Sequence, residues 1–376
     1  MQTPPPDMTD VNPTAAATEP DSAHPQADTA SAAVAPPPAK KKPVRRKGDR
    51  AQVLRRAVQL AFLALNVWIG VQFYLFVRFF ETGGASTWAT RPAGVEGWLP
   101  IAGLMNLKAL LLTGSMPELY PAGLVLFLAF LAISIVFRKA FCSWLCPVGT
   151  LSEALWKAGR RLLGRSFLLP RWLDLPLRGL KYLLLAFFLK TVFVDMPLFA
   201  VQAFFQNPYG LTLDLRMLDF FRHMGGTAAA VVGALAVASL LVPNFWCRYA
   251  CPYGAFMGLA GWLSPLRIRR DPDPCIDCGK CAKVCPSRLP VDVKLNVLSP
   301  ECTGCLECVS ACPVQGALDL AAPVRRRVPA WVVAAGVAGL FLAFVGVAKL
   351  TGHWDGALPA EAWWDLVRTS AGAAHP

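Results

Sequence analysis

Residues 275–313 read CIDCGKCAKVCPSRLPVDVKLNVLSPECTGCLECVSACP, and this stretch decides how the rest of the chain is interpreted. It contains two copies of the pattern Cys-x2-Cys-x2-Cys-x3-Cys-Pro, one over residues 275–286 and one over 302–313. In bacterial iron–sulfur domains, the three close cysteines of such a run hold one [4Fe–4S] cluster, and the fourth ligates the other cluster. We therefore predict two [4Fe–4S] clusters, one held by Cys275, Cys278, Cys281 and Cys312 and the other by Cys302, Cys305, Cys308 and Cys285.

Zinc is the alternative metal that these eight cysteines could bind, because paired Cys-x2-Cys units also bind zinc tetrahedrally. Two complete runs that both end in Cys-Pro favour iron–sulfur clusters. All twelve cysteines of the chain fall in repeated motifs, and none is left over. We expect them on the cytoplasmic side, where thiols stay reduced and clustered cysteines usually hold metal, so a disulfide framework is not predicted.

A second repeat joins residues 141–151, FCSWLCPVGTL, with residues 246–256, WCRYACPYGAF. Each copy contains Cys-x3-Cys-Pro, the end of an iron–sulfur run without its beginning, and the two halves could meet to complete one four-thiolate site. Three interpretations remain open for these cysteines: ligands of a further iron–sulfur centre, a redox-active thiol set, or small buried residues at helix ends. The duplication favours the first. The residues concerned are Cys142, Cys146, Cys247 and Cys251.

The rest of the chain is markedly apolar, with a mean hydropathy of +0.43 and 16% charged residues. About 20 helical residues cross a hydrocarbon core of roughly 30 Å. Five segments satisfy this: 57–77, 120–137, 182–198, 227–242 and 328–348. The predicted fold is an α-helical polytopic membrane protein with about five transmembrane helices. Two tandem units, each a helix pair followed by Cys-x3-Cys-Pro, precede a cytoplasmic α+β insert for the two clusters.

The positive charges follow the predicted span ends, so the net charge of +13 indicates topology rather than nucleic-acid binding. Arg55 and Arg56 flank the first span, which exceeds a signal-peptide apolar region and is expected to be an uncleaved anchor. We predict a Pro- and Ala-rich cytoplasmic tail with a basic end (1–50), a first helix-pair unit (51–151), a basic cytoplasmic loop (152–177), a second unit (178–265), the two-cluster domain (266–320), a fifth span (328–350) and a periplasmic tail (351–376).

The two Cys-x3-Cys-Pro motifs, followed by the tandem cysteine runs, resemble the NapH/NosR-like polyferredoxin membrane proteins over about residues 57–318. This resemblance implies electron transfer between the quinone pool and a periplasmic or membrane-bound redox partner, at the bacterial inner membrane. The chain departs from the family in its long front segment, its fifth predicted span and its lack of a NosR-type periplasmic flavin domain. The particular partner therefore stays open.

Two further interpretations of function stay open. The chain could be an assembly factor that delivers electrons to a metal such as copper, or to a thiol, of a respiratory enzyme. It could also be a regulatory redox sensor that uses the basic tail to bind a partner or anionic lipid. Lys190 and Asp195 fall in the third predicted span, where charge indicates function, and are candidates for a quinone or proton site. Any catalysis would be of the quinol dehydrogenase type, with the chemistry supplied by the clusters.

Overall fold

The structure is a computed structural model that describes residues 44–46, 50–164, 167, 169–323, 326–359 and 361–370. Most of the predicted N-terminal tail lies outside the described residues. All described residues belong to one unit, Lys41–Pro376.

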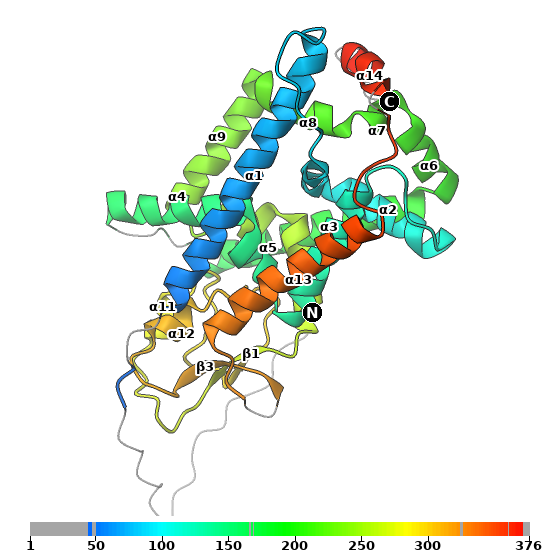
Figure 1. Ribbon diagram of the computed structural model, residues 1–376. Helices are drawn as coiled ribbons and strands as arrows, with labels where there is room; N and C mark the ends of the chain where they lie inside the picture. Colours follow the sequence, from blue (N-terminus) through cyan, green and yellow to red (C-terminus); the bar gives the residue numbers. More distant parts are fainter. Residues whose placement is uncertain are drawn as a thin grey trace, which may run out of the picture. The chain divides into compact units, whose positions relative to one another are not determined.

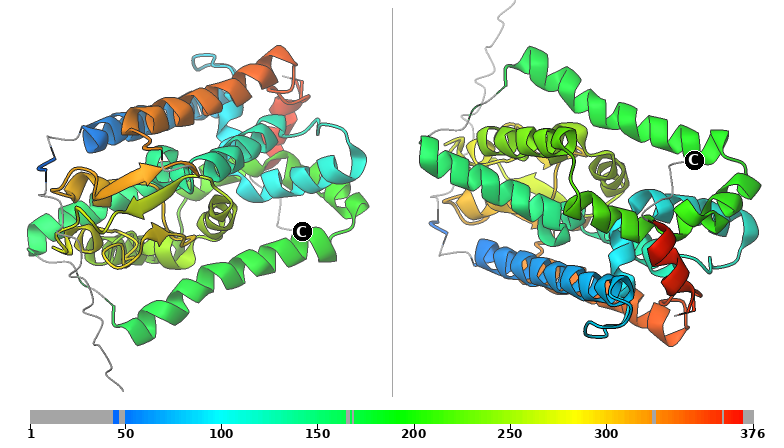
Figure 2. Two further views of the ribbon diagram at one scale, coloured as in Figure 1. Left: turned by 90° about the horizontal axis from the view of Figure 1, so that it is seen from below. Right: turned by 90° about the horizontal axis from the view of Figure 1, so that it is seen from above.

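Two long helices, α1 (Ala51–Glu81) and α13 (Ala330–Leu350), are each long and apolar enough to cross a membrane. They lie side by side in both views of Figure 2, although residues 82–329 separate them along the chain. An edge-to-face contact between Phe62 and Phe341, with ring centroids 5.2 Å apart, joins them. Apolar side chains that remain exposed on both helices, including Trp68 and Leu342, suit contact with lipid.

Two further candidate spans are bent pairs of helices. α5 (Arg171–Lys190) continues through the π-helical turn η3 (Thr191–Asp195) and then bends by 100° into α6 (Leu198–Gln206). Lys108 stabilises this bend by donating hydrogen bonds to the backbone oxygens of Val192, at 2.9 Å, and Phe193, at 3.2 Å. α8 (Leu213–Arg222) and α9 (Gly226–Leu241) meet at 81°.

The second predicted span, 120–137, forms only the 16-residue helix α3 (Pro121–Val136), which is shorter than the other candidates. Its 16 residues rise about 24 Å at 1.5 Å per residue, and most of its side chains are buried against neighbouring helices. α3 is the central core helix of the described chain, in contact with α13, α2 and α10. By length and composition, the described residues provide two candidate spans, or up to four if each bent pair is one span, so five spans are not confirmed.

The two-cluster domain contains a three-stranded antiparallel sheet in the order β2-β1-β3. Ile268 of β1 pairs with Val297 of β2 and with Leu320 of β3, and it is almost completely buried. These strands share one apolar core with α3 and α13, through residues such as Phe130 and Val337. The domain is thus packed directly on the helical part (Figure 1).

The remaining elements complete the path of the chain (Figure 1). They are η1 (Ala93–Trp98), α2 (Pro100–Thr113), η2 (Phe141–Leu145), α4 (Pro147–Leu163), α7 (Pro208–Leu211), η4 (Trp246–Ala250), α10 (Pro252–Trp262), β1 (Arg267–Arg270), α11 (Lys280–Lys283), β2 (Asn296–Val297), α12 (Glu307–Ala311), β3 (Leu318–Ala321) and α14 (Ala362–Ser370). α14 lies in the predicted C-terminal tail and packs on α1 through Trp363 and Phe76, with ring centroids 5.3 Å apart.

Candidate functional site

The eight cysteines of the tandem runs line two separate small cavities. One cavity contains the first three cysteines of the first run and the last cysteine of the second: Cys275, Cys278, Cys281 and Cys312. The other contains the opposite set: Cys302, Cys305, Cys308 and Cys285. These are the two interleaved sets that the spacing predicts, and we call the cavities the outer cluster cavity and the inner cluster cavity, respectively.

The backbone turns in the same way in both runs. Asp277 and Gly279 of the first run have φ values of 51° and 65°, and Gly304 and Leu306, at the corresponding positions of the second run, have 61° and 60°. Positive φ is uncommon for residues other than glycine and marks backbone that tertiary contacts hold in place. This repeated left-handed path curves each loop around its cavity, so that successive cysteines face a common centre.

Within the described residues, no group of three or more His, Cys, Asp or Glu side chains is arranged to hold a single metal ion.

The second repeat folds into two copies of one local structure. In each copy a π-helical turn, η2 or η4, is followed by a helix whose N-cap is the second cysteine. The Sγ atom of Cys146 accepts a hydrogen bond from Gly149 N at 3.4 Å, and that of Cys251 accepts one from Gly254 N at 3.2 Å. Free backbone N–H groups at a helix N-terminus stabilise negative charge, as on a ligating thiolate.

The structure brings the four cysteines of the two copies to the wall of one large cavity. We call Cys142, Cys146, Cys247 and Cys251 the cysteine quartet. Burial raises the pKa of the Cys142 thiol to about 11 and that of Cys146 to about 12. Burial thus opposes ionisation of these thiols when no metal is bound. A cationic iron–sulfur core would offset the charge of four ligating thiolates, because metal binding and deprotonation of its ligands are coupled.

The large cavity has a volume of about 860 Å³ and is mostly apolar. Along α1 its lining extends from Arg55 to Gln72, a rise of about 25 Å at 1.5 Å per residue. Phe341 and Val345 of α13 form another part of the wall, and Trp98, which donates a hydrogen bond to Asn66 Oδ1 of α1 at 3.1 Å, also lines it. The cavity therefore leads from the cysteine quartet along the two longest helices.

The cysteine quartet lies directly beside the inner cluster cavity. Cys305, Thr303, Pro286 and Ser287 line both that cavity and the large one. Hydrogen bonds from the π-helical turns fix this arrangement, since Ser143 Oγ donates to Thr303 O at 2.6 Å and Trp144 Nε1 to Gly304 O at 3.2 Å. Arg248 of the second copy donates to Pro286 O at 3.1 Å. The three thiol sets thus follow one another as quartet, inner and outer.

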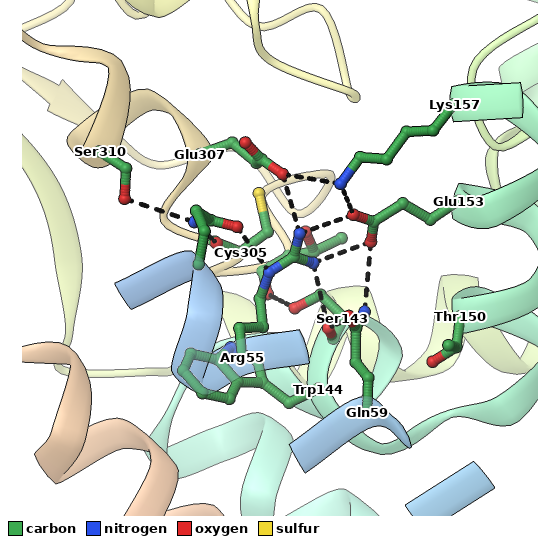
Figure 3. A network of polar contacts seen from close by, with 12 residues as sticks. Arg55, Gln59, Ser143, Trp144, Thr150, Glu153, Lys157, Cys305, Glu307 and Ser310 are labelled. Atoms are coloured by element: carbon green, nitrogen blue, oxygen red, sulfur yellow. Dashed lines mark hydrogen bonds and ion pairs between the residues drawn. The ribbon is translucent and has the colours of Figure 1, made fainter. Parts of the chain in front are cut away.

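A buried ionic network joins α1, α4 and α12 at the same place (Figure 3). Arg55, only 1% exposed, lies 2.6 Å from Glu153 Oε1 and 2.9 Å from Glu307 Oε1. Burial opposes ionisation of Glu153, but hydrogen bonds from Arg55 and Lys157 lower its pKa to about 2. From the sequence, Arg55 is recognised only as a positive charge at the end of the first predicted span, and its ion pairs with Glu153 and Glu307 are not. Partners 98 and 252 residues away leave no local signal in the sequence.

Lys190 and Asp195 pair with each other, with Nζ 2.6 Å from Oδ1. Their side chains are 65% and 45% exposed, and neither lines the large cavity or the two cluster cavities. The structure gives them a surface ion pair at the η3 turn and does not bring them to the cysteine quartet.

Gly149 is required by close packing inside the first Cys-x3-Cys-Pro copy. A Cβ atom at this position would lie 2.3 Å from Cys142 O, whereas one at Gly254 would meet Cys251 Sγ at 3.5 Å and Cys247 O at 3.7 Å, which are ordinary contacts. Gly149→Ala should therefore displace Cys142 and destabilise the protein by about 1–3 kcal/mol, as overpacking does. Thermal loss of iron–sulfur absorbance measures this effect. Gly254→Ala is the matched control, and equal melting of the two variants would contradict the prediction.

Sequence comparisons identify iron–sulfur domains over these regions. A family described as "4Fe-4S binding domain" matches residues 119–166 and 224–270, each of which holds one Cys-x3-Cys-Pro copy. A family described as "4Fe-4S dicluster domain" matches residues 267–313. With the cysteine geometry, these matches define the class of the protein: the chain belongs to the ferredoxin-type membrane electron-transport proteins with [4Fe–4S] domains.

The chain is similar to YccM of Escherichia coli strain K12, whose name proposes a role in electron transport. The two are 49% identical over 319 residues, which cover 83% of this chain and 89% of YccM. The ferredoxin-type protein NapH of the same organism is 29% identical over 186 residues, 46% of this chain and 59% of NapH. The regulatory protein NosR of Pseudomonas aeruginosa is 29% identical over 222 residues, 56% of this chain and 29% of NosR. These relatives confirm the family that the sequence motifs indicate. No solved structure matches the chain.

Proposed function

We propose that this protein transfers electrons between a membrane quinone and a redox partner protein through three [4Fe–4S] centres, held by the cysteine quartet, the inner set and the outer set. The observation that carries this proposal is the continuity of the large cavity. It starts at the quartet, shares part of its wall with the inner cluster cavity, and follows α1 and α13 along its apolar length.

The cavity suits the two parts of a quinone. Trp68, Leu65 and Leu342 line it and are also exposed on the helix surfaces, so an isoprenoid tail can enter from lipid. Glu153 and Glu301 line the wall near the quartet. They would offer hydrogen-bond partners to a quinone headgroup that lies beside the cysteines, as sparse polar groups do in apolar ligand sites.

Iron–sulfur clusters, when bound, supply one-electron carriers. Oxidation of one quinol releases two electrons and two protons. Because each cluster accepts one electron, the two electrons would leave the quinol one at a time. The protein's own part is to hold the three sets in sequence through the hydrogen bonds of Ser143, Trp144 and Arg248. Cys278 of the outer set is exposed, which makes that set the natural contact point for a partner protein.

We propose a cytoplasmic position for the cluster domain, in the inner membrane of a bacterium. Lys157 of the basic helix α4 pairs with Glu307 of the domain at 3.2 Å, so this helix lies at the same end as the clusters. Basic segments favour the cytoplasmic side.

The test uses anaerobically purified full-length protein and a soluble quinol analogue, with EPR and optical spectra recorded before and after mixing. We expect cluster reduction by the quinol. Val345→Trp, which fills the cavity beside α13, should slow this reduction at least about tenfold, the size of a 1.4 kcal/mol effect, while reduction by dithionite stays unchanged. Leu350→Trp is the control, because Leu350 is 90% exposed and does not line the cavity.

Clusters that accept electrons from dithionite but not from quinol would contradict the proposal and favour an assembly factor with another electron donor. Equal quinol rates in the Val345→Trp and Leu350→Trp variants would show that the quinol reacts elsewhere.

A further inference from the structure

The charged side chains at the quartet end of the large cavity are nearly all balanced by partners. Arg55 is paired with Glu153 and Glu307, as described above. Arg248 lies 2.9 Å from Asp174 Oδ1. In the described chain, the one charged residue at this end of the cavity without an ion-pair partner is Lys139.

A second buried lysine lies nearby, but its charge is neutralised. Lys181 is fully buried, with Nζ 2.5 Å from Glu301 Oε2, and Glu301 also accepts a hydrogen bond from Tyr182 OH at 2.7 Å. Glu301 directly precedes Cys302 of the inner set. Glu301 also interacts with Lys139, whose positive charge lowers the pKa of that carboxyl group, so the two lysines and the one carboxylate together carry a net charge of about +1 beside the quartet.

Lys139 is held in place by its backbone and its surroundings. It follows Arg138, which has a φ of 61° at the end of α3, and precedes Cys142 by three residues. It is only 4% exposed, and it lines the large cavity. Its positive charge acts on the thiols of Cys142, Cys247 and Cys251, so it serves both copies of the repeat.

A buried excess of positive charge is costly unless an anion compensates it. A [4Fe–4S] centre with four thiolates is such an anion, since the 2+ core leaves a net charge of about −2 that becomes about −3 on one-electron reduction. A fixed positive charge nearby stabilises the reduced state more than the oxidised state. Groups beyond the ligands commonly tune cofactors in this way.

We propose that Lys139 raises the reduction potential of the centre on the cysteine quartet, and so makes this centre the first acceptor of electrons that enter from the cavity. The inference rests on the proposed function, because it requires a centre at the quartet. The electron balance is simple: one electron enters the quartet centre and passes to the inner centre, and Lys139 itself is neither oxidised nor reduced.

The test is a redox titration of the full-length protein, followed by EPR, for the wild type and three variants. Lys139→Met keeps most of the side-chain volume and removes the charge, and Lys139→Arg keeps the charge. Lys294→Met is the control, because it removes an exposed cation that lines none of the three cavities. We expect Lys139→Met to lower the midpoint potential of the quartet signal alone, and Lys139→Arg and Lys294→Met to leave it near the wild-type value.

The outcomes separate this inference from the proposed function. A wild-type protein with only two cluster signals would overturn both. Three signals in all variants with an unchanged quartet potential in Lys139→Met would overturn only the role of Lys139. Loss of the quartet centre in Lys139→Met, with the other two clusters intact, would also overturn it, because the lysine would then be needed for assembly rather than for potential.

Discussion

Cys251→Ser is expected to lower the iron content from about twelve to about eight atoms per chain, the difference of one [4Fe–4S] centre. It should also abolish reduction of the remaining clusters by quinol. Cys251 caps α10 and lines the large cavity with the other three quartet cysteines. A serine hydroxyl is a far poorer ligand for iron than a thiolate, so the centre nearest the quinone should be lost and the path interrupted at its first step.

Iron and acid-labile sulfide analysis, EPR and quinol mixing measure this result. Cys278→Ser is the matched comparison, since Cys278 is the exposed cysteine of the outer set at the other end of the path. It should perturb only the outer cluster and leave the quartet signal responsive to quinol. A Cys251→Ser protein that keeps about twelve irons, or that stays reducible by quinol, would show that the quartet holds no centre on the electron path.

The cluster domain is the part of the protein that the sequence predicts best. Ligand spacing within a run of eleven residues leaves few ways to surround a cluster. The spacing therefore predicts that Cys312 joins the first three cysteines of the first run, and that Cys285 joins those of the second. The structure places both cysteines there. Their role as ligands stays a prediction that the titrations above address. For the quartet cysteines, a further iron–sulfur centre is one of three interpretations that the sequence allows. The sequence does not show whether two motifs about a hundred residues apart meet.

The membrane part was predicted less well, for a physical reason. Hydropathy shows that a segment is apolar, but it does not distinguish a helix facing lipid from one buried among helices. The segment 120–137 is apolar because α3 is the core of the described chain, where Ala122, Leu124 and Ile133 are fully buried. Bends such as the 100° turn before α6 depend on tertiary hydrogen bonds from Lys108, which no local pattern reveals.

Arg55→Met is expected to destabilise the protein by about 3–5 kcal/mol, the usual cost of removing one partner from a buried ion pair. Arg55 is 1% exposed, and its loss leaves Glu153 and Glu307 with Lys157 alone. The same change removes one of two hydrogen bonds to Ser143 O beside the quartet, the one from Arg55 Nη1 at 3.3 Å, and leaves the one from Gln59 Nε2 at 2.9 Å. Both the stability of the α1–α4–α12 junction and the position of the first repeat should therefore suffer.

Chemical denaturation in detergent, followed by loss of cluster absorbance, measures this change. Arg222→Met is the control, because the Arg222–Glu81 pair is 26% and 34% exposed and should contribute under about 1 kcal/mol. The double variant Arg55→Met/Glu307→Gln restores the charge balance, since Lys157 and Glu153 remain as a pair at 2.5 Å. It should recover part of the lost stability. The second substitution changes the charge balance but does not restore the packing of the arginine stem. If the double variant is no more stable than Arg55→Met, it is therefore the packing of this stem, and not the balance of charge, that holds the cluster domain against α1.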